Sequence, residues 1–277
     1  MVEVYACWAI TDNPVMSETA ITSRDNPVFK RLRRLAESSR ARREARMTLL
    51  DGEHLLAAYL DAGGVPHTLV RGTSTDAGRL ASFAARCPQT RTLVMADALF
   101  SELTPVAAPT GILAEAAWLA PPEPRDVAPF VVVLEDIQDP GNLGAMLRTA
   151  AAAGATVAVL SKGCHDAWSP KALRGGQGAQ FVLPMRTGVD VPAWLQAFAG
   201  QRVALALGGD SDVYALDLTG PLALIAGNEG AGLSPEVCAL ATRRAHIPMV
   251  GRVESLNAAA ALAVVSFEAL RQRRRRS

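Results

Sequence analysis

The feature that most constrains this fold is an uninterrupted apolar run, V-V-V-L, at residues 131–134. A strand that is apolar on both sides belongs inside a sheet whose two faces are both covered. Short segments typical of further strands follow at 156–160, 180–183, 203–207, 222–226 and 245–248. Helices are expected between and after them, at about 143–153, 189–199, 234–242 and 255–271. This alternation predicts an α/β fold, with a parallel sheet and helices on both of its sides.

The first part of the chain shows a second, smaller α/β pattern. Val28, Leu32 and Leu35 lie at helical spacing and predict a basic amphipathic helix within 27–46. A short apolar pair at 49–50 follows. Strands are then expected at 67–70, 91–95 and 111–117, and helices at 53–62, 75–86 and 97–103.

Four prolines within 116–130 predict a stiff linker between these two patterns. We therefore divide the chain into a leader, a first domain, a linker and a second domain, at 1–20, 21–117, 118–128 and 129–277. The leader shows no regular pattern and is expected to be disordered. Either Met1 or Met16 could be the natural start.

The net charge of +1 conceals a strong asymmetry. Residues 24–46 hold nine Lys or Arg against three acids, and residues 271–276 hold five arginines and no acid. Basic blocks on an otherwise acidic chain favour contact with a polyanion. The same blocks are equally compatible with a solvated helix face and a disordered tail.

The four cysteines are scattered along the chain and form no C-x-x-C: Cys7, Cys87, Cys164 and Cys238. Scattered thiols indicate a reducing cytoplasm rather than a disulfide framework. The histidines do not pair with them at metal-ligand spacing, so we expect no metal site. The chain also lacks the roughly 20 consecutive apolar residues of a membrane helix and the basic and then apolar start of a secretory signal.

Two segments combine an apolar strand, a glycine-containing turn and isolated polar residues. The first is L-E-D-I-Q-D-P-G-N-L-G-A-M-L-R-T-A at 134–150. Its D-P-G-N is a turn by composition, at the carboxyl end of a strand, where open α/β sheets bind ligands. Asn142 is either a helix cap or a site residue, and Arg148 is either a surface residue or one that reaches back over the sheet edge.

The second segment is A-L-I-A-G-N-E-G-A-G-L-S-P-E at 223–236, followed by H-I-P-M-V-G-R-V-E-S-L-N at 246–257. Its glycines fit neither a P-loop nor the G-x-G-x-x-G of dinucleotide-binding folds. That mismatch argues against a nucleotide-dependent oxidoreductase. Glu229 within the loop is unsuited to phosphate. It is either a solvent-exposed acid or the partner of a cation such as Arg148.

Together these segments resemble the three motifs of the SpoU/TrmH family of RNA 2′-O-ribose methyltransferases, within the SPOUT class. The resemblance implies that the second domain forms a deep trefoil knot. It implies a catalytic centre made of Asn142, Arg148, Glu229, Ser255 and Asn257. It also implies that S-adenosylmethionine binds at Leu207, Gly208, Gly227, Asn228, Ile247, Met249 and Leu256. One departure is S-L-N-A-A-A-A at 255–261, where many members have S-L-N-V-S-V-A.

The same resemblance implies an RNA substrate. The first domain resembles the family's substrate-binding domain of L30e-like type, which favours large-subunit ribosomal RNA over transfer RNA. Its expected RNA contacts are Arg24, Lys30, Arg31, Arg34, Arg42 and Arg43. Near the glycines of 175–179, Ser169, Lys171 and Arg174 are either phosphate contacts or part of a flexible loop. The family is usually homodimeric through the knotted domain. The alternatives are a transfer RNA 2′-O-methyltransferase and a non-catalytic RNA-binding module of the same fold.

Our hypothesis for the methyl-transfer chemistry gives a role to four residues of the implied catalytic centre. Arg148 would hold the target phosphate and stabilise the forming alkoxide, because a guanidinium essentially never deprotonates in proteins. The proton would leave through phosphate or water. Glu229 would orient Arg148, while Asn142 and Asn257 would fix the geometry.

Overall fold

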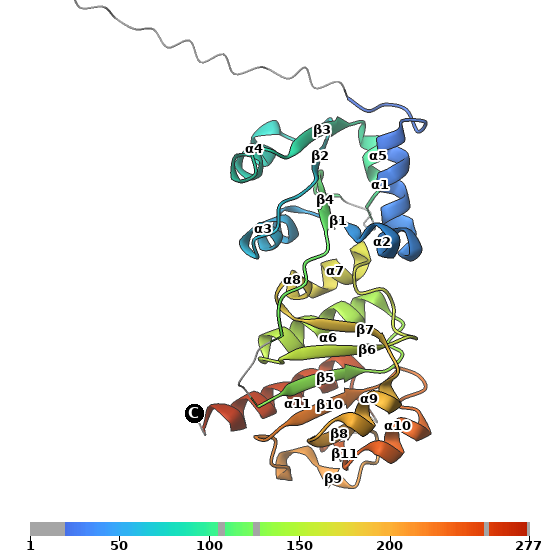
Figure 1. The fold of residues 1–277 in the computed structure, drawn as a ribbon, viewed down its shortest axis with the longest axis vertical. Helices are drawn as coiled ribbons and strands as arrows, with labels where there is room; N and C mark the ends of the chain where they lie inside the picture. The colour runs from blue at the N-terminus through green and yellow to red at the C-terminus, as the bar shows by residue number, and fades with distance from the viewer. Residues whose placement is uncertain (1–19, 105–108, 124–127, 252–254, 276–277) are drawn as a thin grey trace, which may run out of the picture.

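The computed structural model describes residues 20–104, 109–123, 128–251 and 255–275. The expected leader, up to residue 19, lies outside them. The chain forms two sheets, one of four strands and one of seven. The two sheets lie one above the other along the long axis of the molecule, with the smaller one nearer the N-terminus (Figure 1).

The smaller sheet has the strand order β1-β4-β2-β3. Its strands are β1 (Met47–Asp51), β2 (Thr68–Gly72), β3 (Arg91–Met95) and β4 (Ile112–Ala117). β4 runs antiparallel to both neighbours, whereas β2 and β3 are parallel. Five helices accompany the sheet: α1 (Pro27–Glu37), α2 (Ser39–Ala45), α3 (Glu53–Asp61), α4 (Ala77–Arg86) and α5 (Asp97–Ser101).

The basic region predicted as one helix is in fact two helices. Ser38 adopts an extended conformation and ends α1. Its hydroxyl then accepts a hydrogen bond from the Ala41 amide and caps α2, as a serine before a helix commonly does. The break turns the second half of the basic region toward the rest of the molecule.

The larger sheet is parallel throughout, in the order β7-β6-β5-β10-β8-β11-β9. Its strands are β5 (Phe130–Leu134), β6 (Val157–Ser161), β7 (Met185–Val189), β8 (Gln201–Leu205), β9 (Ser211–Asp212), β10 (Leu222–Ala226) and β11 (Arg243–His246). Every residue of β5 and β10 is buried. The prediction of a parallel α/β sheet built around residues 131–134 is therefore confirmed.

Helices cover both faces of this sheet. On one face, α6 (Pro140–Ala152) and α11 (Ala258–Arg274) pack on alternate side chains of β5, together with the 3-10 helix η1 (Val213–Ala215). On the other face, α9 (Val191–Ala197) and α10 (Pro235–Leu240) cover the remaining side chains of β5 and β10. None of the described helices is long and apolar enough to cross a membrane.

Two local predictions in this half were wrong. The strand expected at 180–183 is a short helix, α8 (Ala179–Val182), and the strand follows it as β7. Between β6 and α8 lies a further helix, α7 (Pro170–Gly176), which is capped by Ser169 and includes the first two glycines of the 175–179 cluster. Finally, α6 begins at Pro140 rather than Leu143, because Asp139 accepts the first-turn amide hydrogen bond from Asn142.

The two halves share a core. α7 and α8 lie between the two sheets (Figure 1), and α7 packs against both β1 and α6. Trp168 stacks on Trp118 with ring centroids 5.2 Å apart, and Phe181 meets the edge of Tyr59 at 5.2 Å. Trp118 belongs to the expected linker, so the start of that linker is packed into the interface between the halves.

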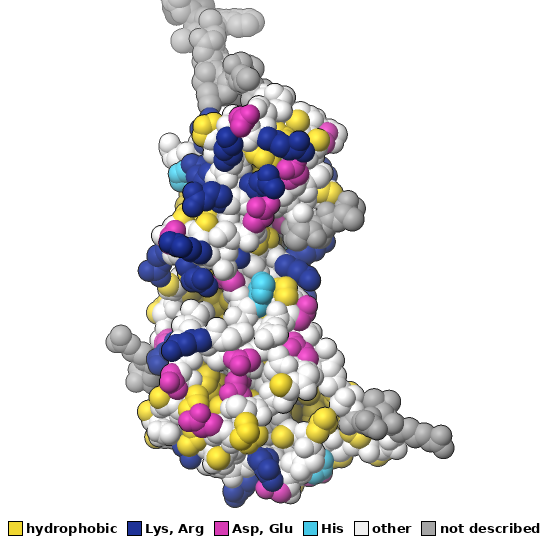
Figure 2. Space-filling model, turned by 90° about the vertical axis from the view of Figure 1, so that its right-hand side faces the viewer, with side chains coloured by type: hydrophobic (Ala, Val, Ile, Leu, Met, Phe, Trp, Pro, Cys, Tyr) yellow, Lys and Arg dark blue, Asp and Glu magenta, His cyan; other side chains and the backbone are white. Residues whose placement is uncertain are grey.

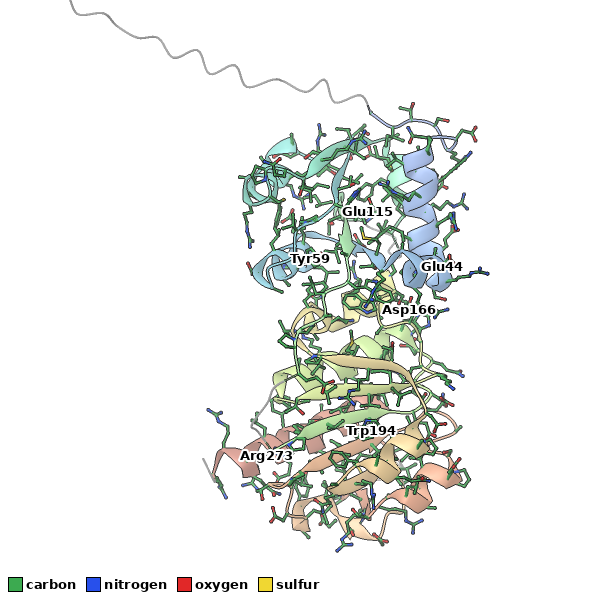
Figure 3. The ribbon with its side chains drawn as sticks, in the orientation of Figure 1. Glu44, Tyr59, Glu115, Asp166, Trp194 and Arg273 are labelled. Carbon is green, nitrogen blue, oxygen red and sulfur yellow. The ribbon has the colours of Figure 1, made fainter. Side chains whose placement is uncertain are left out.

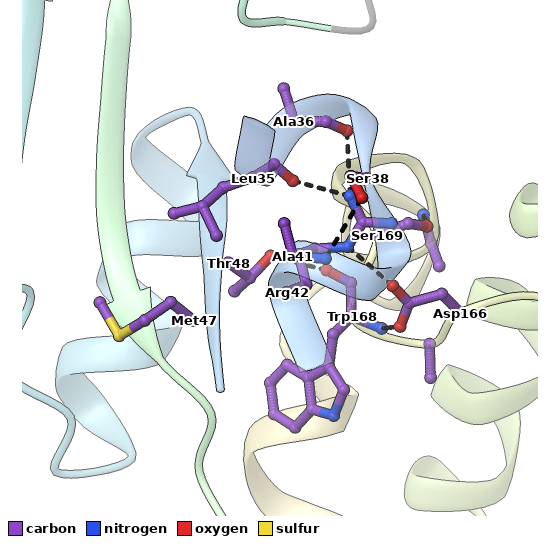
Figure 4. A network of polar contacts seen from close by, with 12 residues as sticks. Leu35, Ala36, Ser38, Ala41, Arg42, Met47, Thr48, Asp166, Trp168 and Ser169 are labelled. Carbon is purple, nitrogen blue, oxygen red and sulfur yellow. Dashed lines mark hydrogen bonds and ion pairs between the residues drawn. The ribbon is translucent and has the colours of Figure 1, made fainter. Parts of the chain in front are cut away.

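The structure corrects the expectation that Arg42 contacts RNA. Its side chain is only 4% exposed, and its Nε donates to the Asp166 carboxylate at 2.7 Å. Its Nη1 donates to the carbonyls of Leu35 and Ala36, at 2.7 and 3.0 Å (Figure 4). A buried guanidinium needs such partners. Arg42 therefore joins α2 of the first domain to the loop before α7 in the second, as the position of Asp166 in Figure 3 shows.

Candidate active site

The carboxyl ends of β8, β10 and β11 enclose a cavity of about 650 Å³ with the start of α11. This is the edge at which open parallel sheets bind ligands. The cavity is lined by residues from 205–209, 226–233, 245–249 and 255–261. All seven residues expected to contact the methyl donor line it: Leu207, Gly208, Gly227, Asn228, Ile247, Met249 and Leu256. Two of the expected catalytic residues, Glu229 and Ser255, line it as well.

The glycine loop after β10 folds back closely on itself. The backbone amides of Asn228 and Gly232 each donate to the other residue's carbonyl, at 3.1 and 2.9 Å. A Cβ on Gly227 would lie 2.5 Å from the carbonyl carbon and oxygen of Gly232. Only glycine fits such a backbone approach, so the sequence of the loop fixes the shape of the cavity wall.

The Asn228 side chain is used within the protein. Its Oδ1 accepts from the amides of Gly230 and Ala231, both at 2.9 Å. Its Nδ2 donates to the Asp136 carbonyl at 2.9 Å. Asn228 thus connects the glycine loop to the loop after β5. Because its side chain is engaged in these bonds, its backbone is the part available to a ligand in the cavity.

Glu135 is a structural residue that the sequence interpretation missed. It follows β5 and is 8% exposed, and its carboxylate accepts from the amide and hydroxyl of Ser234, at 2.8 and 2.7 Å. The Ser234 hydroxyl in turn caps α10. Glu135 therefore anchors the far end of the glycine loop. An acid directly after a buried strand was the available signal for it.

Three of the five expected catalytic residues are joined by hydrogen bonds, although they lie far apart in the sequence. Asn142 donates from Nδ2 to the Glu229 carboxylate at 2.9 Å. Asn257 donates from Nδ2 to the Asn142 Oδ1 at 3.4 Å. The Oδ1 of Asn257 caps α11, so its position is set by the helix. We call this set the polar chain. It reaches the cavity through Glu229.

Glu229 bonds to Asn142, and the described residues show no hydrogen bond or ion pair between Glu229 and Arg148. Of the two interpretations of Asn142, the helix cap is wrong, because Asp139 fills that position. Arg148 is exposed and makes no hydrogen bond or ion pair with any described residue. It lies six residues beyond Asn142 on α6, roughly 9 Å along the helix axis.

The expected RNA contacts of the first domain differ in how they are paired. Arg24, Lys30 and Arg31 form ion pairs with Glu102, Asp25 and Glu115. Arg34 and Arg43 are exposed and have no such partner among the described residues. Figure 2 shows Lys and Arg side chains gathered over the N-terminal half, interspersed with acids. The basic region therefore offers less free positive charge than its composition suggests.

The residues around α7 are ordered. The Ser169 hydroxyl accepts from the Ala172 amide at 3.2 Å and caps the helix. Arg174 is 3.5 Å from the Asp51 carboxylate of the first domain. Lys171 is exposed. Ser169 and Arg174 thus have partners within the protein, and phosphate contact in this stretch stays a prediction. Over the described ranges, no group of three or more His, Cys, Asp or Glu side chains is arranged to hold a metal ion.

Comparisons with known proteins agree with this geometry. Residues 129–267 match the model of the SpoU rRNA Methylase family. An uncharacterized tRNA/rRNA methyltransferase of Synechocystis is 33% identical, over 94% of this chain and 96% of its own length. The 23S rRNA (uridine(2479)-2′-O)-methyltransferase of Streptomyces viridochromogenes is also 33% identical, over 91% of this chain and 92% of its own length.

A solved structure has the same architecture over nearly the whole chain. The SpoU methyltransferase AviRb from Streptomyces viridochromogenes, in complex with the cofactor AdoMet, superposes with a TM-score of 0.80 and 30% identity. The match covers 90% of this chain and 98% of that one. With its parallel sheet, its glycine loop and the family match over the second domain, this chain belongs to the SpoU rRNA methylase family.

Proposed function

We propose that this chain transfers a methyl group from S-adenosylmethionine to a ribose 2′-hydroxyl of ribosomal RNA. As a member of the SpoU rRNA methylase family it is an RNA methyltransferase. The observation that carries the proposal is the hydrogen-bonded set of Asn142, Glu229 and Asn257, of which Glu229 lines the cavity. Relatives named for 23S rRNA favour ribosomal RNA over transfer RNA as the substrate.

The cavity suits the donor in chemistry and shape. Leu207, Met249 and Leu256 line it while 76%, 40% and 39% exposed, and apolar side chains grouped in this way mark a surface that a ligand covers. Gly208 and Gly227 bring backbone groups to its wall. When bound, S-adenosylmethionine supplies an electrophilic methyl group on a sulfonium. Our proposal is that these residues and Ile247 hold it, with Asn228 contributing only its backbone.

The role of Arg148 in this proposal is to bind the RNA phosphate and to stabilise the alkoxide that forms on the ribose. The side chain is exposed and unpaired among the described residues, so a phosphate would meet a free guanidinium. The polar chain reaches the cavity through Glu229, which lines it. Ser255, on the cavity rim, completes the set. The proton leaves through phosphate or water, because Arg148 does not release one.

Arg148→Ala tests the proposal. We expect the variant to bind S-adenosylmethionine as the wild type does, by calorimetry, and to lose about 100- to 1000-fold in methyl transfer to 23S ribosomal RNA, the scale of removing one preorganised electrostatic contact. Arg91→Ala, an exposed arginine at the start of β3, is the matched control. A near wild-type rate for Arg148→Ala would refute its role. If the wild type neither binds the donor nor methylates RNA, the chain is the non-catalytic RNA-binding module instead.

The proposal extends to the wider organisation of the protein. Residues 21–117 would act as the L30e-like substrate domain, and the path from β11 to α11 would tie the trefoil knot, because α11 returns across the sheet to pack on α6. Two copies would pair through their knotted domains in the cytoplasm. The exposed Phe267 on α11 suits such an apolar contact. Light scattering on the purified protein tests the dimer.

A further inference from the structure

One segment connects the first domain to the cavity: residues 162–171, which we call the bridge segment. Near its middle, Asp166 accepts a hydrogen bond from Arg42 in α2 at 2.7 Å. The amide of the adjacent His165 donates to the Ile137 carbonyl at 2.8 Å. Ile137 lies two residues before Asp139, the cap of α6. The bridge segment is therefore bonded both to the basic helices and to the loop that leads to Asn142.

A second contact ties the start of the bridge segment to the glycine loop. Ser161, the residue before it, donates from its hydroxyl to the Asp136 carboxylate at 2.5 Å. The Asp136 carbonyl accepts from Asn228 in the glycine loop. The bridge segment thus lies beside the edge of the sheet at which the polar chain and the cavity are found.

Two lysines of the bridge segment lack internal partners. Lys162 and Lys171 are both exposed, and neither makes a hydrogen bond or ion pair with any described residue. The carboxylates around them are engaged: Asp136 by Ser161, Asp139 by the Asn142 amide and Asp166 by Arg42. An ammonium group with no protein partner is available to an external anion.

These lysines continue the free positive charge of the first domain. Arg43 is exposed and unpaired among the described residues, and it follows the buried Arg42 directly in α2. Lys171 comes five residues after Asp166, the partner of Arg42. Exposed cations without a side-chain partner among the described residues therefore lie close in sequence to both partners of the ion pair that joins the domains.

We infer that the bridge segment is a contact surface for the RNA backbone, with Lys162 and Lys171 binding phosphates between the first domain and the polar chain. The inference rests on the proposed function. Lysine is a compact point charge that suits phosphate contact, and such contacts position RNA without reading its bases. The bridge segment would set where the target ribose lies relative to the cavity. The first domain would bind further parts of the RNA.

Charge reversal in the full-length protein tests the inference. For Lys162→Glu and Lys171→Glu we expect about 10-fold weaker binding to transcribed 23S ribosomal RNA at about 50 mM salt for each change, with KM raised in proportion and kcat kept. The plot of log affinity against log salt should become shallower by about 0.7–0.9 for each phosphate that the variant no longer binds. Binding of S-adenosylmethionine, measured by calorimetry, should be unchanged.

Arg91→Glu is the matched control. Arg91 is exposed, has no partner among the described residues and starts β3, at the opposite edge of the smaller sheet from β1. We expect it to leave the salt slope unchanged. The double variant, Lys162→Glu with Lys171→Glu, would overturn the inference if it methylated RNA with the KM and salt slope of the wild type. An effect of Arg91→Glu equal to that of either lysine would also overturn it.

The two proposals fail in different ways. If the wild type methylates no ribosomal RNA but its salt-dependent RNA binding is lost in the double variant, the proposed activity fails and the contact surface remains.

Discussion

The buried ion pair between Arg42 and Asp166 makes a quantitative prediction. The two side chains are 4% and 8% exposed, and the Nε–carboxylate distance is 2.7 Å. Arg42→Ala would leave the Asp166 charge in the interface without its cation. It would also leave the carbonyls of Leu35 and Ala36 without the guanidinium donor. Breaking a buried pair in this way costs about 3–5 kcal/mol of unfolding free energy.

A loss of that size is easily measured. At roughly 2–4 °C per kcal/mol for a domain of 150–250 residues, Tm should fall by about 6–20 °C. Urea unfolding followed by circular dichroism gives the free energy directly. The double variant Arg42→Met with Asp166→Leu should recover part of the loss, because replacing both charges leaves no uncompensated ion.

Arg40→Ala is the control, on the same helix. Arg40 is 84% exposed, and its guanidinium bonds to Glu44 in an i,i+4 pair. Glu44 lies near the end of α2 (Figure 3). Exposed pairs of this kind contribute about 0.3–0.5 kcal/mol. If Arg42→Ala also lost less than about 1 kcal/mol, the pair would be solvated and the account of a rigid connection between the domains would be refuted.

Two further perturbations address the glycine loop and the bridge segment. Gly227→Ala should weaken S-adenosylmethionine binding at least 10-fold in calorimetry, because its methyl group would meet the backbone of Gly232; Gly220→Ala, with open space around it, should not. Equal affinities would contradict the close-approach argument. Burial lowers the pKa of His165 below its ordinary 6.5, so the unfolded chain binds the extra proton more readily. Stability should therefore fall as pH drops below about 6.5, and His165→Gln should flatten that fall in a series of melts; identical profiles would contradict it.

Much of the second domain could be predicted because its central strands, β5, β6 and β10, are apolar and buried on both faces. The strand at 222–226 has the bounds expected for it, and the helix after Ser234 and Pro235 begins where a cap and an N-terminal proline indicate. The seven residues expected to bind the donor were carried over by resemblance, and all of them line one cavity. Periodicity alone would not have separated them from core residues.

The errors have local physical causes. The run Q-F-V-L at 180–183 is short and apolar, and such runs do not distinguish a strand from a buried helix. Here Gln180 donates its amide to the carbonyls of Ala167 and Ala172, which a helix allows. The helix α7 was not predicted from the sequence, because the glycines at its end are typical of a loop. A Cβ on Gly175 would lie 3.0 Å from the Gly141 carbonyl, so the glycine is there for close helix packing rather than flexibility.

Composition could not tell which cations are free. Arg42 and Arg43 are adjacent in a run of basic residues, yet one is buried and the other exposed. The difference depends on Asp166, more than a hundred residues away, and on which side of α2 faces the second domain. The local pattern of charge therefore cannot predict which of the two arginines is buried.

The packed interface between the two halves sets the spacing of the two sheets. Trp118 on Trp168, Thr48 on the Trp168 carbonyl and Arg42 on Asp166 already hold the sheets at one spacing. Trp118 lies at the start of the expected linker, so that end of the connecting peptide is itself part of the interface. The distance from the basic helices to the carboxyl edge of the larger sheet is therefore set by side-chain packing rather than by the length of the connecting peptide.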